Sequence, residues 1–170
     1  MSIENPLPDV TAPSAETSGL IPGHTTVVAV VIEWRGKIAL FKRSQHLHHD
    51  RGLWHCITGY LEPGVTPKQQ ALDELLEETG IHPTNLLDLR AGPDLVISDD
   101  DGQPWLVHTF TAVTSKRRLH IDWEHDSYRW TAPGKMKRFA NRVAWLDLVL
   151  QATLPHSEPS ISGREPPPES

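Results

Sequence analysis

Three glutamates within one helical turn, Glu74, Glu77 and Glu78, carry the strongest chemical signal in this 170-residue chain. At about 100° per residue they share one helix face, and the opposite face holds Leu72, Leu75, Leu76 and Thr79. Like charges at this spacing destabilise a helix unless a cation lies among them, and oxygen ligands of this kind suit Mg²⁺. The pattern therefore indicates either a cation site or a solvated acidic face, which is the common role of a charge run.

The helix that would carry these glutamates has clear start and stop signals. Thr66 suits the N-cap, and Pro67 suits the first helical position, where a missing N–H costs nothing. Gly80 suits the C-terminal end, where chains often turn into the left-handed conformation. The sequence therefore predicts a helix from Pro67 to Thr79, entered through a glycine-containing loop that starts at Gly59.

Loop and helix together, residues 59–81, resemble the Nudix box, G-x5-E-x7-R-E-U-x-E-E-x-G-U, in which U is aliphatic. The fixed positions that match are Gly59, Glu74, Leu75, Glu77, Glu78, Gly80 and Ile81. Val65 stands where the family has its first Glu, and Asp73 stands where it has Arg. In the family these two residues form an ion pair between loop and helix. Because both are replaced here, no unpaired charge remains, and the resemblance implies that the loop is held differently.

The resemblance also implies a fold and an activity. The expected fold is α/β, the Nudix-type α/β/α sandwich with a mixed β-sheet between helices. The expected reaction is hydrolysis of the pyrophosphate linkage of a nucleoside diphosphate joined to a group X, or of a related phosphoanhydride. Such a reaction uses Mg²⁺ or Mn²⁺ to neutralise phosphate charge and to generate hydroxide from water.

Position by position, the resemblance assigns roles to four residues of the box. Glu74, Glu77 and Glu78 match the family's metal-binding glutamates, and Glu74 also matches the general base of some members. Gly59 matches a glycine whose main-chain carbonyl binds metal, and the absence of a side chain there lets the chain approach closely.

A further acidic residue, Glu124, lies in the segment DWEHD, shortly before an expected strand that contains Trp130. Its position is similar to that of an additional Glu in some nucleotide-cleaving members. We therefore expect Glu124 to serve as a metal ligand or catalytic base. Asp122 and Asp126 compete for that role, and the alternative for Glu124 is to cap or solvate its loop.

Signals for substrate binding are weaker. Lys42 and Arg43 end an expected strand near the box, where they would either meet phosphates or form a solvated strand end. Tyr128, like Trp105 and Trp130, would either stack on a base or belong to the core. The histidines of the loop at 44–52 lack a completing ligand at a defined spacing, which leaves a metal role there without support.

Composition narrows the classes of protein. The length suits one domain, and 38% hydrophobic residues suffice for a core. A net charge of −6, from 22 acidic and 16 basic residues, argues against a partner that is a nucleic acid polymer. The single cysteine, Cys56, excludes an intrachain disulfide, and no apolar run approaches the roughly 20 residues of a membrane span. Without a visible secretory signal, we expect a cytoplasmic protein that does not associate with membranes.

The expected elements divide the chain into a disordered arm at 1–22, a Nudix domain at 23–154 and a disordered Pro/Ser-rich tail at 155–170. Periodicity predicts strands at 25–34, 37–43, 53–58, 86–90, 95–98, 105–113, 119–121 and 128–131. The segment Asp99–Gly102 predicts a hairpin turn, and a helical region is expected from Pro133 to Leu154. This order favours a mixed sheet packed between helices.

Three functions remain open on the sequence. The first is a metal-dependent hydrolase acting on a small-molecule phosphoanhydride. The second is a catalytically impaired Nudix-like module that binds a ligand or regulates a partner, although a pure binder has no need of three glutamates. The third, an isomerase of prenyl diphosphates, would need a reactive cysteine, whereas Cys56 is expected in an apolar strand. The resemblance also allows a homodimer.

Overall fold

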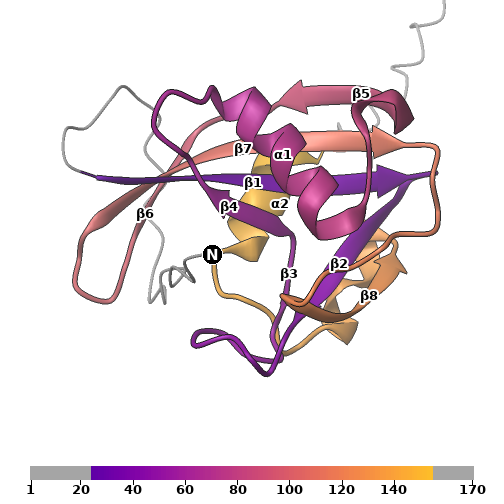
Figure 1. Cartoon of the computed structure of the whole chain (residues 1–170). Helices are drawn as coiled ribbons and strands as arrows, with labels where there is room; N and C mark the ends of the chain where they lie inside the picture. Colours follow the sequence, from indigo (N-terminus) through magenta and orange to yellow (C-terminus); the bar gives the residue numbers. More distant parts are fainter. Residues whose placement is uncertain (1–23, 155–170) are drawn as a thin grey trace, which may run out of the picture.

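The computed structural model describes residues 24–154, and the arm and tail expected at the two ends lie outside the described residues. Two α-helices and eight strands form the domain, with two short 3-10 helices between them (Figure 1). The strands are β1 (Thr25–Trp34), β2 (Lys37–Arg43), β3 (Trp54–His55), β4 (Ile57–Tyr60), β5 (Leu86–Ala91), β6 (Leu95–Ser98), β7 (Pro104–Thr114) and β8 (His125–Thr131). The helices are α1 (Pro67–Thr79), η1 (Pro83–Asn85), η2 (Pro133–Arg138) and α2 (Leu146–Thr153).

The central strand β1 is apolar on both faces, because a helix packs on each side of the sheet. Its side chains alternate between two buried clusters. Val27, Ala29 and Val31 pack with α2, whereas Val28, Val30 and Ile32 pack with α1. Figure 1 shows α1 across one face of the sheet and α2 behind the other. The expected α/β fold with a mixed sheet between helices is therefore confirmed.

The sheet divides on either side of the parallel pair β1–β7. The outer edge of β1 pairs first with β4 and then, after the strands diverge, with β2. The outer edge of β7 likewise pairs with β6 and then with β5. Strand β8 extends the sheet along β2. The segment β3–β4 crosses the gap between β2 and β1, and it delivers Gly59 to the face on which α1 lies.

Several sequence predictions need correction. The strand expected at 53–58 is two strands separated by Cys56, because Trp54 and His55 pair with β2 whereas the residues from Ile57 onward pair with β1. The segment 119–121 is not a strand. Leu119 instead buries its side chain against the α1 face and donates its N–H to the Tyr128 hydroxyl at 3.1 Å.

The last helix is also shorter than expected. Residues 141–143 bond to the main chain of Trp54, with Asn141 accepting at 2.9 Å and Val143 donating at 3.0 Å. This pairing precludes helical hydrogen bonds there, so α2 begins only at Leu146. None of the helices in residues 24–154 combines the length and apolar character needed to cross a bilayer.

Candidate functional site

The α1 helix has the bounds and caps that its sequence predicts. The Thr66 side chain accepts a hydrogen bond from the Gln69 N–H at 3.2 Å, and Gly80 ends the helix at φ 71°. The helix does not, however, place all of its glutamates in solvent. Glu78 is only 3% exposed, whereas Leu76, expected on the buried face, is 41% exposed. The interpretation of the glutamates as a solvated acidic face is therefore wrong for Glu78.

The rotation of α1 follows from the residues that anchor it. Ala71, Leu75 and Thr79 are buried on the sheet. Beside them, at four-residue spacing, Gln70, Glu74 and Glu78 form a polar row along the helix. This row carries two of the expected metal-binding carboxylates, and Glu77 extends the acidic surface outward from it, where it is exposed.

Gly59 lies in β4 directly opposite this row. A Cβ atom added to Gly59 would collide with the Glu74 carboxyl, so this close approach of strand and helix requires glycine. The structure thus brings the Gly59 main chain and the Glu74 side chain together.

Gln70 connects the loop before α1 to the helix. Its side-chain carbonyl accepts the Glu62 N–H at 3.1 Å, and its amide donates to Glu74 Oε1 at 2.9 Å. At 3% exposure it is a buried, neutral link. Asp73, which stands at the family's arginine position, instead accepts from the Gln69 side chain at 2.8 Å on the exposed side. We therefore identify Gln70 as the contact that holds this loop in place of an ion pair.

Residues 122–125 close the far side of the cluster. The Glu124 N–H donates to Asp122 Oδ1 at 3.1 Å, and the Glu124 carbonyl accepts from the Ser44 N–H at 2.8 Å. His125 is buried, with its Nε2 3.9 Å from Glu78 Oε1 and its Nδ1 3.3 Å from Asp122 Oδ1. The Nδ1 contact lacks hydrogen-bond geometry, so we describe it as an electrostatic contact only. His125 thus lies between the helix and the loop that carries Glu124.

Burial and mutual repulsion favour protonation of the cluster. Burial raises the pKa of Glu74 from 4.5 to about 7, with Glu77 and Glu124 adding to the rise and the Gln70 hydrogen bond opposing it. The pKa of Glu78 lies well above its ordinary value, first because of burial and then because of the charges of Glu74 and Glu124. Burial and the carboxylates around it also raise the pKa of Glu77. The negative charges of these carboxylates would stabilise a cation bound among them.

Three observations fit a metal at this cluster. Glu78 Oε2 is buried without a hydrogen-bond partner, Gly59 leaves space beside Glu74, and the donors are all oxygens, which suit Mg²⁺ or Mn²⁺. Within residues 24–154, no three His, Cys, Asp or Glu side chains already lie in a metal-binding arrangement. The oxygen donors present suit the ion, although within residues 24–154 the carboxylates do not converge on one point.

The residues expected to bind substrate are not brought together. Arg43 is buried and donates from Nε and Nη2 to the His49 carbonyl at 3.3 Å. Lys42 pairs with Trp54 and follows Phe41, so by strand alternation it faces away from α1. Tyr128 faces α1 and lines a separate pocket of about 630 Å³.

Cys56 is buried as expected, and burial raises the pKa of its thiol to about 12.

Two residues of the site were missed by sequence reasoning. Gln70 precedes Glu74 by four residues, and that helical spacing was a usable signal because side chains so placed are neighbours. His125 had no such signal, since its contacts with Glu78 and Phe41 arise only when β8 pairs with β2.

Comparison with known sequences finds a matching domain family and a curated relative. A model of the NUDIX domain matches residues 22–151. An octanoyltransferase of Myxococcus xanthus is 32% identical over 118 residues, covering 64% of this chain and 31% of that protein. The chain thus spans about a third of the length of this curated relative.

Solved structures share the fold at low sequence identity. The NUDIX domain of Shewanella oneidensis NrtR complexed with ADP ribose matches with a TM-score of 0.61 at 19% identity, over 77% of this chain and 87% of that one. A MutT protein from Methanosarcina mazei matches with a TM-score of 0.62 at 19% identity, over 78% and 94%. A bifunctional NMN adenylyltransferase/ADP ribose pyrophosphatase from Francisella tularensis matches with a TM-score of 0.65 at 17% identity, over 78% and 41%. With a domain model covering most of its length and the fold of these structures, the chain belongs to the Nudix family.

Proposed function

We propose that this chain is a metal-dependent pyrophosphohydrolase that cleaves a nucleoside diphosphate linked to a group X, or a related phosphoanhydride. The observation that carries the proposal is the partly buried row of Glu74 and Glu78 beside Gly59, with Glu124 facing it from the loop before β8. Like charges at such a position destabilise the fold, which makes a purely structural role a poor explanation for them.

The residues have distinct roles in this proposal. Glu77, Glu78, Glu74, Glu124 and the Gly59 carbonyl hold Mg²⁺ or Mn²⁺, which when bound neutralises phosphate charge and lowers the pKa of a water. Gln70 fixes the orientation of the Glu74 carboxyl through its amide. His125 limits the movement of Glu78 on the inner side.

Glu74 is suited to accept a proton from the attacking water. Its carboxyl lies against Gly59 within the cluster, and the Gln70 amide orients it. Glu124 is the second base in this scheme, since it faces the same cluster from the loop.

The substrate panel follows from the named neighbours. One is described in complex with ADP ribose and another as an ADP ribose pyrophosphatase, so ADP-ribose heads the panel. Nucleotide sugars, dinucleoside polyphosphates, nucleoside triphosphates, dinucleotides and prenyl diphosphates complete it, each with Mg²⁺ and with Mn²⁺. The expected result is metal-dependent turnover of one class, lost in both Glu77→Gln and Glu78→Gln.

The alternative is a Nudix-like module that binds a ligand without cleaving it. The panel separates the two functions: saturable binding of a compound with no turnover under either metal would establish the module and refute the hydrolase. An isomerase of prenyl diphosphates is disfavoured, because the one cysteine is buried and its thiol holds its proton to about pH 12.

A further inference from the structure

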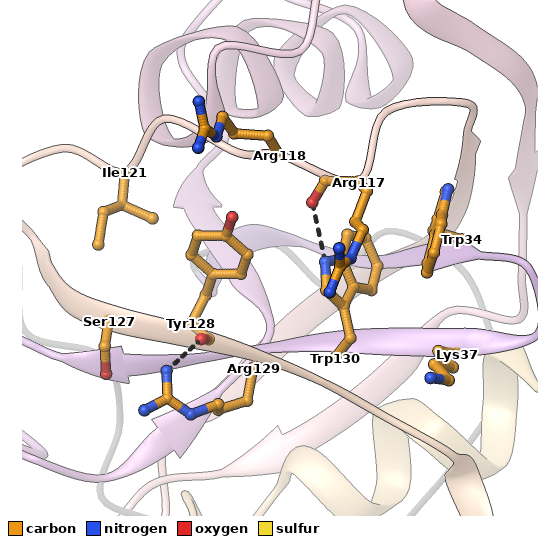
Figure 2. Close-up of a pocket in the computed structure, with 9 residues that line it drawn as sticks. All are labelled: Trp34, Lys37, Arg117, Arg118, Ile121, Ser127, Tyr128, Arg129 and Trp130. Carbon is orange, nitrogen blue, oxygen red and sulfur yellow. Dashed lines mark hydrogen bonds between the residues drawn. The ribbon is translucent and has the colours of Figure 1, made fainter.

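A second concave site lies on the α1 side of the sheet, away from the glutamates. It is a pocket of about 630 Å³ between β8, the β1–β2 turn and residues 117–121 (Figure 2). Its lining is Trp34, Lys37, Arg117, Arg118, Ile121, Ser127, Tyr128, Arg129 and Trp130. Four of these side chains are cations, three are aromatic and none is a carboxylate, although the chain as a whole has a net charge of −6.

The aromatic walls are held in place by hydrogen bonds. The Trp130 indole N–H donates to the Arg117 carbonyl at 2.9 Å, and the Tyr128 hydroxyl accepts from the Leu119 N–H at 3.1 Å. Figure 2 shows Tyr128 and Trp130 pointing from β8 toward the segment that carries Arg117 and Arg118. Because both rings are tied to that segment, the pocket is formed before any ligand arrives, which lowers the entropy cost of binding.

The rings offer a stacking surface. Trp34 lies beside Trp130, with ring centroids 5.7 Å apart and planes tilted by 47°. The guanidinium groups of Arg35 and Arg117 lie 5.2 and 5.9 Å from the Trp34 ring centroid. Indole faces that attract cations also stack on planar heteroaromatic groups, and guanidinium groups bind phosphate oxygens in a bidentate manner.

We propose that this pocket binds a planar anion, an aromatic base or ring that carries a phosphate, such as a nucleoside monophosphate. The ring lies against Trp34 and Trp130, and the phosphate is bound by Arg117, whose guanidinium lies beside Trp34. This site needs no metal and does not depend on the hydrolase function proposed above.

The first test is a titration of ¹⁵N-labelled protein with AMP in EDTA, followed by NMR. The chain has six tryptophans, so indole N–H signals are few, and Trp34→Phe and Trp130→Phe assign the two in the pocket. AMP is expected to shift these two signals and the amides of 117–121 in a saturable manner. Adenosine and inorganic phosphate each supply half of the ligand. Their affinities are expected to be lower than that of AMP by a factor of about ten or more.

Charge variants give the second test. The variant Arg117→Ala removes an exposed cation and is expected to weaken AMP binding about tenfold or more, leaving weak adenosine binding unchanged. Arg138→Ala, an exposed arginine outside the pocket, is the matched control and should bind AMP as the wild type does. AMP affinity should also fall between low and high salt, because exposed charges are screened.

Glu77→Gln separates this proposal from the hydrolase. It is expected to abolish metal-dependent turnover while AMP in EDTA still shifts the Trp34 and Trp130 signals. The pocket proposal is refuted if AMP leaves both indole signals in place, if its shifts gather around Gly59 and Glu78 instead, or if Arg117→Ala binds AMP as tightly as Arg138→Ala.

Discussion

Two oppositely charged regions lie on the same face of the sheet. One is the glutamate cluster of α1, and the other is the basic aromatic pocket at the far end of β8. Residues 115–124 run between them, with Lys116, Arg117 and Arg118 at the pocket end and Asp122 and Glu124 at the cluster end. The segment is attached to α1 in its middle, where the His120 N–H donates to the Thr79 carbonyl at 2.9 Å.

The two regions differ in how their charges are held. Glu78 is buried, and burial is the main cause of its raised pKa, so the folded state tolerates this carboxylate at a free-energy cost. Arg117, Arg118 and Arg129 are exposed, and water already solvates them. The buried carboxylates of the glutamate cluster therefore lower the stability of the folded protein. The exposed arginines of the pocket can bind an anion with little effect on that stability.

The largest effect that this contrast predicts is that of Glu78→Gln. The substitution removes a buried ionisable group that a metal would bind as a carboxylate, so hydrolysis of the substrate found in the panel should fall roughly 10²–10³-fold, the range seen when one electrostatic group is removed from an active site. In EDTA the melting temperature should stay level or rise, because repulsion and desolvation are relieved. Calorimetry and initial rates measure the two.

Glu62→Gln is the matched control for this substitution. It removes one negative charge from an exposed side chain beside the cluster, and it should leave both activity and melting temperature near wild type. If Glu78→Gln instead lowers the melting temperature and retains activity, the glutamate has a structural role and the contrast between the two regions is wrong.

Gln70→Ala should have the next largest effect. It leaves the Glu62 N–H and the Glu74 carboxyl without their partner, so the free energy of unfolding should fall by about 1–3 kcal/mol. Turnover should fall about 10–100-fold, as is common when a group that orients a metal ligand is lost. Gln69→Ala, one position away and exposed, should change stability by no more than about 0.5 kcal/mol. Equal effects of the two variants would exclude Gln70 as the link between loop and helix.

The pH dependence of stability should also reveal the cluster. Because the folded-state pKa of Glu74 is about 7 rather than 4.5, the folded protein binds the extra proton, and stability in EDTA should fall as pH rises from 4.5 through about 7. A shift of this size corresponds to at most about 3 kcal/mol. With Mn²⁺ present the fall should shrink or reverse, since a metal binds the deprotonated carboxylates. The double variant Glu74→Gln/Glu78→Gln should show neither effect, and an unchanged slope in it would assign the dependence to other groups.

The smallest effect is expected for Val65→Glu/Asp73→Arg, which restores the residues of the family pattern. Gln70 already links the loop to α1, and an exposed ion pair adds only about 0–1 kcal/mol. Activity should therefore change by less than about fivefold, with the fold retained. A folded but inactive double variant would show that the native pair takes part in the site in a different geometry.

Local signals predicted much of the fold. The bounds of β1, β2 and α1 follow from apolar runs and from the caps at Thr66 and Gly80, because neighbouring residues decide them. The β6–β7 hairpin follows from the turn at Asp99–Gly102 for the same reason. The break at Cys56 was not predictable, since it depends on which strands lie on each side of the gap.

The candidate site likewise has some features that the local sequence predicts and others that depend on tertiary packing. The sequence identified the three glutamates and Gly59, but the face on which Glu78 lies depends on how Ala71, Leu75 and Thr79 seat α1 on the sheet. A wheel drawn from hydrophobicity put Leu76 inside and Glu78 outside, because it assumes that the buried face is the apolar one. At a site that holds buried carboxylates, this assumption fails.

The neutral link made by Gln70 has a consequence for the working range of the protein. A Glu–Arg pair between loop and helix would loosen as the glutamate protonates, and screening by dissolved ions would weaken it further. An amide has no proton to gain or lose and no net charge to screen. The hydrogen bond from the Glu62 N–H to the Gln70 side chain is thus the same in acid and in neutral solution, and at low and high salt. Only the carboxylates beside it respond to these conditions.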